Sequence, residues 1–152
     1  MTPPETLDAI PGARAAILER LAAAAKASGR AADAVTLVAV SKKQPDERIE
    51  AMLAAGQRIF GENRVQEAQG RWSERRKAVD DLELRLVGPL QTNKADDAVA
   101  LFDVIETLDR DKLARSLKTA MDKTGRSPRL YVQVNTGEEA QKAGVAPSDT
   151  AE

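Results

Sequence analysis

The chain of 152 residues is predicted to adopt an α/β fold built on a parallel sheet. Short apolar runs of strand length alternate along it with longer segments of helical composition. Most of these runs end in a polar or glycine-containing loop, such as Ser41-Lys42-Lys43 after the first run and Gly88-Pro89 after the third. Strands that alternate with helices of about 10 to 15 residues are typical of βαβ units, in which neighbouring strands run parallel.

Five strands are expected, each followed by a helix except the last. The apolar runs that predict them lie at residues 37–41, 58–61, 82–87, 103–107 and 130–134. The intervening helices are expected at residues 46–55, 65–79, 94–101 and 111–123. An alanine- and leucine-rich segment at 6–28 predicts a further helix before the first strand. No linker interrupts this pattern, so residues 1–152 are expected to form a single domain.

Residues at the helix ends refine these expectations. Asp46 is expected to cap the helix that follows the first strand, and Asp109 or Asp111 to cap the one that follows the fourth. Gly125 is expected to end the latter helix. In the first helix, Pro11-Gly12 is expected to kink or restart the backbone.

The composition excludes several classes of function. Lys and Arg number 23 against 24 Asp and Glu, so no net charge attracts nucleic acid or a membrane surface, and neither partner is expected. The chain has no cysteine and no histidine, which removes the thiolate nucleophile, the usual general base and the commonest metal ligand. No metal site is therefore expected. No apolar run approaches the roughly 20 residues of a membrane span, and no signal pattern opens the chain, so a cytoplasmic protein is expected.

Lys42 is the first candidate for chemistry. It follows a buried-type strand, and Gln44-Pro45 end that strand. The carboxyl ends of parallel strands are where α/β proteins place their sites. An amine that is partly desolvated there has a lowered pKa and can attack an aldehyde to form a Schiff base. The alternative is a solvated lysine in an ordinary strand-to-helix loop.

Loops after the other strands meet Lys42 at the same edge of the sheet. They contain Gly61-Glu62-Asn63-Arg64, the segment from Gly88 to Lys94, and a loop with Glu138-Glu139 and Lys142. Because parallel strands all point the same way, these loops are expected to form a ligand-facing rim. Taken singly, each also reads as a turn or a cap.

Two other features are interpreted as surface. The basic segment at 71–77, which contains Trp72, is expected to be a solvated helix face, because acidic residues flank it and it holds a single aromatic residue. The adjacent carboxylates Glu138-Glu139 are expected on a loop surface, because neighbouring residues seldom aim at one point.

Four segments together resemble the pyridoxal phosphate homeostasis protein family. They are LVAVSK at 37–42, FGENRVQE at 60–67, LVGPLQTNK at 86–94 and VQVN at 132–135, in the order and spacing of the family. The similarity runs from about Val35 to Pro147, which is nearly the whole chain.

The resemblance implies a fold, a cofactor and two site residues. The fold is a parallel (β/α) barrel of the TIM type, similar to the amino-terminal domain of alanine racemase. The cofactor is pyridoxal 5′-phosphate, held as a Schiff base on Lys42, with Asn63 near its ring. Lys142 matches a loop lysine that faces the same mouth. The family implies carriers that bind or hand over the cofactor, with cofactor-accepting apoenzymes as possible partners, and no catalytic residue or turnover of their own.

The chain departs from the family pattern in two ways. Arg85 and Glu106 stand where family members often have histidine, and the sequence leaves open whether they face the barrel interior. The chain also holds about five of the eight strands of a complete barrel, so an incomplete barrel without the C-terminal strands is expected. In the family, those strands bring the turns that bind the cofactor phosphate. Unpaired edges and exposed apolar side chains are expected to result, at Val38, Val40, Val132 and Val134.

Two other functions stay open at this point. One is a pyridoxal phosphate-dependent racemase or decarboxylase, although a racemase needs a catalytic tyrosine on a second domain and this chain has only Tyr131, within a strand. The other is a fragment that binds nothing until a partner chain supplies the remaining strands.

Overall fold

The computed structural model describes residues 6–151 of the chain, whose centre is a sheet of five parallel strands. Their order in space, β1-β2-β3-β4-β5, is their order along the chain. The strands are β1 (Ala39–Val40), β2 (Ile59–Glu62), β3 (Glu83–Leu86), β4 (Val104–Leu108) and β5 (Arg129–Val132). The α-helices are α1 (Ile10–Ala27), α2 (Asp46–Ala54), α3 (Val65–Ala78), α4 (Ala95–Leu101) and α5 (Asp111–Thr124). Short 3₁₀ turns lie at Leu7–Ala9, Thr92–Lys94 and Pro147–Asp149.

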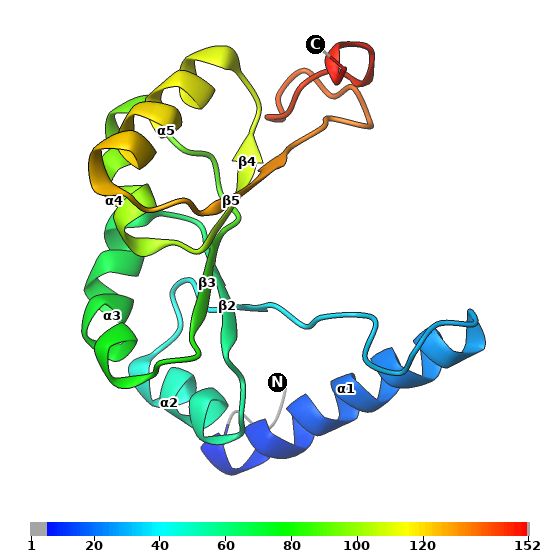
Figure 1. Cartoon of the computed structure of the whole chain (residues 1–152). Helices are drawn as coiled ribbons and strands as arrows, with labels where there is room; N and C mark the ends of the chain where they lie inside the picture. Colours follow the sequence, from blue (N-terminus) through cyan, green and yellow to red (C-terminus); the bar gives the residue numbers. More distant parts are fainter. Residues whose placement is uncertain (1–5, 152) are drawn as a thin grey trace.

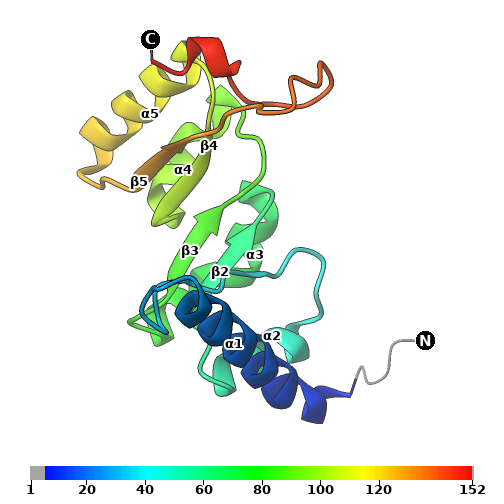
Figure 2. The ribbon, with the colours of Figure 1, turned by 90° about the vertical axis from the view of Figure 1, so that its right-hand side faces the viewer.

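The sheet curves, and its helices lie on one side of it. Helices α2 to α5 follow the convex side, and α1 projects away from the sheet beside α2 (Figure 1). A view at right angles shows the strands stepping from β2 to β5 with their helices behind them (Figure 2). Sequential parallel strands with a helix in each connection are the arrangement of a (β/α) barrel. The predicted fold class, an incomplete parallel barrel preceded by a helix, is confirmed.

The core lies between the sheet and its outer helices. Alternate strand residues point to this side, and helices α3, α4 and α5 bury their apolar faces against them. The Phe60 ring on β2 contacts the Trp72 ring on α3, with 4.6 Å between their centroids. The largest fully buried side chains are Trp72, Phe60, Phe102, Leu84, Leu86, Ile105, Leu113 and Leu117.

The concave face carries charged side chains over β3 and β4. Glu83 and Arg85 alternate along β3 with the buried Leu84 and Leu86, so they point away from the helices. The Arg85 guanidinium pairs with Glu83 and, at 2.9 Å, with Glu106 on β4. It also lies 5.9 Å from the centre of the Tyr131 ring on β5. Arg85 and Glu106, whose orientation the sequence left open, therefore share the concave side of the sheet.

Burial lowers the pKa of Arg85, but the carboxylates of Glu106 and Glu83 raise it. The net effect is a pKa above the usual value of arginine. The arginine thus stays charged and holds three strands together from this side.

Two edge-strand valines are exposed as expected. Val40 on β1 keeps 49% of its surface and Val132 on β5 keeps 53%. Val38 and Val134 are half-buried. Strand β1 is also shorter than its apolar run predicts, since only residues 39–40 pair with β2. On its other side, β1 has no neighbouring strand among the described residues.

The expected N-caps of α2 and α5, Asp46 and either Asp109 or Asp111, are wrong. Pro45 and Arg110 occupy the N-cap positions of α2 and α5, so Asp46 and Asp111 are the first helical residues and make no capping hydrogen bond. There they still favour the helix, because a negative charge in the first turn offsets the macrodipole. Pro11 stands in the first turn of α1, directly after the 3₁₀ turn at Leu7–Ala9, where its missing amide costs nothing. Gly125 ends α5 with a left-handed φ of 73°, as predicted.

The stability of the fold is expected to depend on the sheet–helix core. Replacing Ile105, which is fully buried, by alanine leaves a cavity and should lower the free energy of unfolding by about 2–5 kcal/mol. The same substitution at Ile17, which is 43% exposed on α1, is the matched control and should cost less than about 1 kcal/mol. Urea unfolding followed by circular dichroism measures both. Equal losses at the two positions would show that the core lies elsewhere.

Candidate functional site

Lys42 lies where the sequence placed it, immediately beyond the carboxyl end of β1. Its side chain is exposed, and no hydrogen bond or ion pair joins it to another of the described residues. The residues described therefore do not provide the desolvation that the strand-end position led us to expect. They leave a primary amine that is accessible and without a competing partner.

The residue before Lys42 is bound to a buried carboxylate that the sequence analysis did not single out. Ser41 is 3% exposed, and its hydroxyl donates to Oε1 of Glu62 at 2.6 Å. Glu62, the last residue of β2, is fully buried. It also accepts hydrogen bonds from Nη1 of Arg71 at 2.9 Å and from Nε1 of Trp72 at 3.0 Å. Three donors from β1 and α3 therefore converge on one carboxylate oxygen.

Arg71 and Trp72 therefore correct the interpretation of the basic segment on α3 as a solvated face. Trp72 is fully buried, and the side chain of Arg71 is only 11% exposed. The outer positions of the same turns, Glu74 and Lys77, are exposed and pair with each other at 2.8 Å. The segment contains both kinds of position because a helix turns its residues to opposite sides every two or three positions.

The residues after Lys42 are held by the same helix. Lys43 has a φ of 59°, in the left-handed region, and its amide donates to Oε1 of Glu67 at 2.7 Å. Arg71 reaches Glu67 at 3.1 Å and donates through Nη2 to the carbonyl of Gln44, also at 3.1 Å. The loop that carries Lys42 is thus attached to β2 and α3 on both sides of the lysine.

The ionisation of these groups fits their contacts. The backbone amide of Lys43 lowers the pKa of Glu67 below its usual value, with Arg71 acting in the same direction. For Arg71, burial lowers the pKa, but the hydrogen bonds and charges of Glu62 and Glu67 outweigh it and the pKa is raised.

Asn63 lies in the next loop of the same edge. It lines a groove of about 540 Å³ between the loops after β2 and β3, together with Arg64, Gln66, Pro89, Gln91 and Lys94. Lys42 is not among the residues that line this groove. The two predicted site residues therefore follow neighbouring strands of one sheet edge, and among the described residues they do not share a cavity.

The loop after β5 brings Lys142 to the end of the last strand. Lys142 is exposed and pairs with Glu139 at 2.7 Å. The loop folds back so that Val134 and Val145 form a β-bridge, and the Gly144 amide donates to Asp109. Glu138 and Glu139 are exposed, which confirms that they lie on a loop surface.

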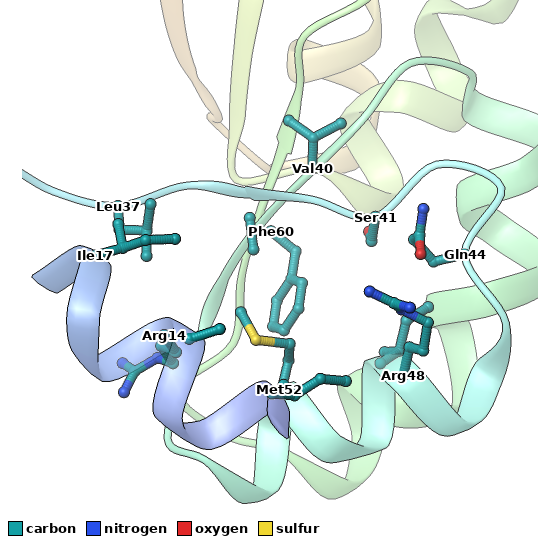
Figure 3. Close-up of a pocket in the computed structure, with 13 residues that line it drawn as sticks. Arg14, Ile17, Leu37, Val40, Ser41, Gln44, Arg48, Met52 and Phe60 are labelled. Atoms are coloured by element: carbon teal, nitrogen blue, oxygen red, sulfur yellow. The ribbon is translucent and has the colours of Figure 1, made fainter. Parts of the chain in front are cut away.

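A more apolar groove of about 350 Å³ lies between α1, β1 and α2. Figure 3 shows Met52 and Phe60 directed into it and Leu37 above Ile17 at its α1 side. Its lining includes Ser41 but not Lys42. The polar side chains of its lining are those of Arg14, Ser41, Gln44 and Arg48.

No group of three or more acidic side chains within residues 6–151 is placed to hold a metal ion. None of the helices in the same range is long and apolar enough to cross a membrane.

The fold and the strand-end lysine define a known class of domain. Residues 14–152 match the family of the alanine racemase N-terminal domain, and the chain belongs to this family.

Within that class, curated relatives are named pyridoxal phosphate homeostasis protein, which confirms the resemblance found in the sequence. The relative from Vibrio cholerae is 38% identical over 86% of this chain and 56% of its own length. The one from Pseudomonas aeruginosa is 38% identical over 89% of this chain and 58% of its own length, and the one from Escherichia coli is 35% identical. The chain thus spans a little over half the length of these relatives.

Solved structures agree. PipY of Synechococcus elongatus, determined with pyridoxal phosphate bound, is 43% identical with a TM-score of 0.70, and covers 88% of this chain and 59% of that one. A protein from Bifidobacterium adolescentis is 28% identical with a TM-score of 0.85. A histidine racemase from Leuconostoc mesenteroides, 12% identical with a TM-score of 0.62, shares the fold.

The close approach of two rim loops makes a testable prediction. A Cβ atom at Gly88 would lie 2.2 Å from the backbone oxygen of Asn63, so Gly88→Ala must push the Asn63 loop away. We expect the free energy of unfolding to fall by about 1–3 kcal/mol, as for an overpacked site.

Gly70 in α3 is the matched control, because nothing lies within 4 Å of its added Cβ. Gly70→Ala should leave stability unchanged or raise it by about 0.5–1 kcal/mol. Thermal and urea unfolding of both variants provide the comparison. A Gly88→Ala protein as stable as the wild type would show that the two loops are not in contact.

Proposed function

We propose that this chain binds pyridoxal 5′-phosphate through Lys42 and takes part in homeostasis of that cofactor, without turnover of its own. The observation that carries the proposal is the accessible, unpaired amine of Lys42 at the carboxyl edge of a parallel sheet of this family. The names of the relatives and the PipY structure with the cofactor bound support the choice of ligand. Cofactor-accepting apoenzymes are the partners that such a role implies.

The residues described fit the aldehyde end of the cofactor. The cofactor would supply an aldehyde carbon, an electrophile that condenses with a primary amine with loss of water. Lys42 supplies such an amine, and nothing in the described part of the chain must be displaced to expose it. Asn63 would offer an amide that both donates and accepts hydrogen bonds to a ring substituent. No glycine-rich phosphate loop of the usual spacing occurs in the sequence.

A racemase or decarboxylase is less well supported. The only tyrosine, Tyr131, is part of β5 and lies against Arg85 on the concave face. The chain has no histidine that could take or give a proton near neutral pH.

A binding unit completed by a second chain is favoured by a specific observation. The edge valines Val40 and Val132 stay exposed, and the match covers only 56% of the length of the Vibrio cholerae relative. In that case residues 1–152, which we propose form one domain, would bind the cofactor only after the second chain is added.

Borohydride reduction in the presence of pyridoxal 5′-phosphate, followed by peptide mass mapping, tests the proposal. We expect the label on Lys42 in excess over Lys43, Lys94 and Lys142, because Lys42 is accessible and its loop is fixed. Lys42→Ala should abolish the absorbance band of the bound cofactor, and Lys43→Ala, one residue away, is the matched control and should keep it. A label spread evenly over these lysines would contradict the proposal.

Asn63→Ala should weaken cofactor binding by about 1–2 kcal/mol, the usual loss for one polar contact. The exposed Asn93 of the next loop is the control, and Asn93→Ala should leave the affinity unchanged. Affinity is measured by titrating the absorbance band, and far-ultraviolet circular dichroism checks the fold. A loss of fold in Asn63→Ala would instead identify Asn63 as a residue that holds the turn.

A further inference from the structure

We propose that Glu62 is the positioning residue for Lys42: its buried carboxylate fixes the loop on both sides of the lysine and thereby presents the amine at the sheet edge. The inference rests on the function proposed above. Glu62 does not touch the lysine, and acts on it through Ser41 and Arg71.

The burial of Glu62 is the first argument. A fully buried carboxylate is costly unless it is paired and hydrogen-bonded. Here Arg71 provides the opposite charge, with Nη1 2.9 Å from Oε1 and 3.2 Å from Oε2. Trp72 and Ser41 complete the set of donors. An apolar residue at the end of β2 would fill the same space without these demands, so the charge calls for a reason beyond packing.

The contacts on the amino side of Lys42 are the second argument. The Ser41 amide donates to the Gly61 carbonyl at 2.9 Å, which continues the β1–β2 pairing one residue past the strand. The Ser41 hydroxyl then binds Glu62, the residue after Gly61. The backbone immediately before Lys42 is therefore fixed to β2 by both its main chain and its side chain.

The contacts on the carboxyl side are the third argument. Arg71, which pairs with Glu62, donates to the Gln44 carbonyl. Arg71 also pairs with Glu67, and Glu67 accepts the Lys43 amide. A left-handed backbone is strained at a non-glycine residue such as Lys43 and persists only when its surroundings enforce it. One chain of charged groups thus holds the residues before and after Lys42 and leaves the lysine side chain unengaged.

The test compares Glu62→Gln with Asp103→Asn. Like Glu62, Asp103 pairs with an arginine, Arg76; it also accepts the backbone amide of Leu84, and it lies at the amino ends of the strands. Glu62→Gln removes the negative charge that pairs with Arg71, and the amide nitrogen that replaces Oε2 cannot accept the second hydrogen bond of Arg71. We expect the ratio of reduced label on Lys42 to that on Lys43 to fall about tenfold, as for the loss of a charge-assisted hydrogen bond.

A second readout needs no cofactor. Backbone amides of residues 42–44 should exchange with deuterium faster in Glu62→Gln than in the wild type, at equal global stability. Asp103→Asn should change neither the label ratio nor the exchange of this loop, even where it lowers the melting temperature as much. A merely structural Glu62 would lower stability and leave both readouts at the wild-type value.

Ser41→Ala keeps the test decisive if Glu62→Gln does not fold, because it removes only the hydroxyl link. It should lower the label ratio about three- to tenfold. The inference would be overturned if folded Glu62→Gln kept the wild-type label ratio and the wild-type loop exchange. If Glu62→Gln does not fold, the same result in Ser41→Ala would overturn it. A wild-type protein without selective labelling of Lys42 would overturn the proposed function, and the exchange data would still decide whether Glu62 fixes the loop.

Discussion

The direction of the strands is the constraint on which the other features depend. Because all five strands are parallel, every strand-to-helix loop leaves the sheet at the same edge. Lys42, Asn63, the loop at Gly88 and the loop with Lys142 are separated by up to 100 residues in the sequence and still lie along that one edge. The opposite edge is left to structural pairs such as Asp103 with Arg76 and the Leu84 amide. The sheet thus separates residues that can meet a ligand from residues that hold the frame.

The first two strands and α3 make up the most constrained part of this edge. Each of Ser41, Glu62 and Trp72 is buried although it carries a polar group, and each satisfies that group with another member of the set. Such a network is sensitive, because removing one member leaves another unpaired in a medium of low dielectric. The exposed lysine beside it gains a defined backbone without giving up its own freedom to bind.

Much of the fold could be predicted from the sequence, and the misplaced features have physical reasons. Apolar runs located the five strands to within a few residues, and the strand-end position of Lys42 follows from its run alone. Glu62 was assigned to a loop, because a carboxylate at a strand end usually faces water and its three donors lie on residues up to 21 positions away. The basic composition of the segment at 71–77 concealed that Arg71 and Trp72 face inward, a matter of helix phase. The sequence could not show whether Arg85 and Glu106 face the barrel interior or the outer helices. Alternation along a strand puts neighbouring residues on opposite faces, but which face is which is known only once the packed helices are known.

The ion pairs on the concave face bear on how a barrel of this kind could be closed. Glu83, Arg85 and Glu106 already satisfy one another there, and Tyr131 lies over the arginine. Any polypeptide that covered this face would have to strip water from charges that gain little new pairing in return. The driving force for closure would therefore come from the two edge strands. New strands there would pair with the free backbone groups and bury Val40 and Val132. Closure would therefore begin with backbone pairing at the edge strands. The charged interior would stay hydrated until the last strand is in place.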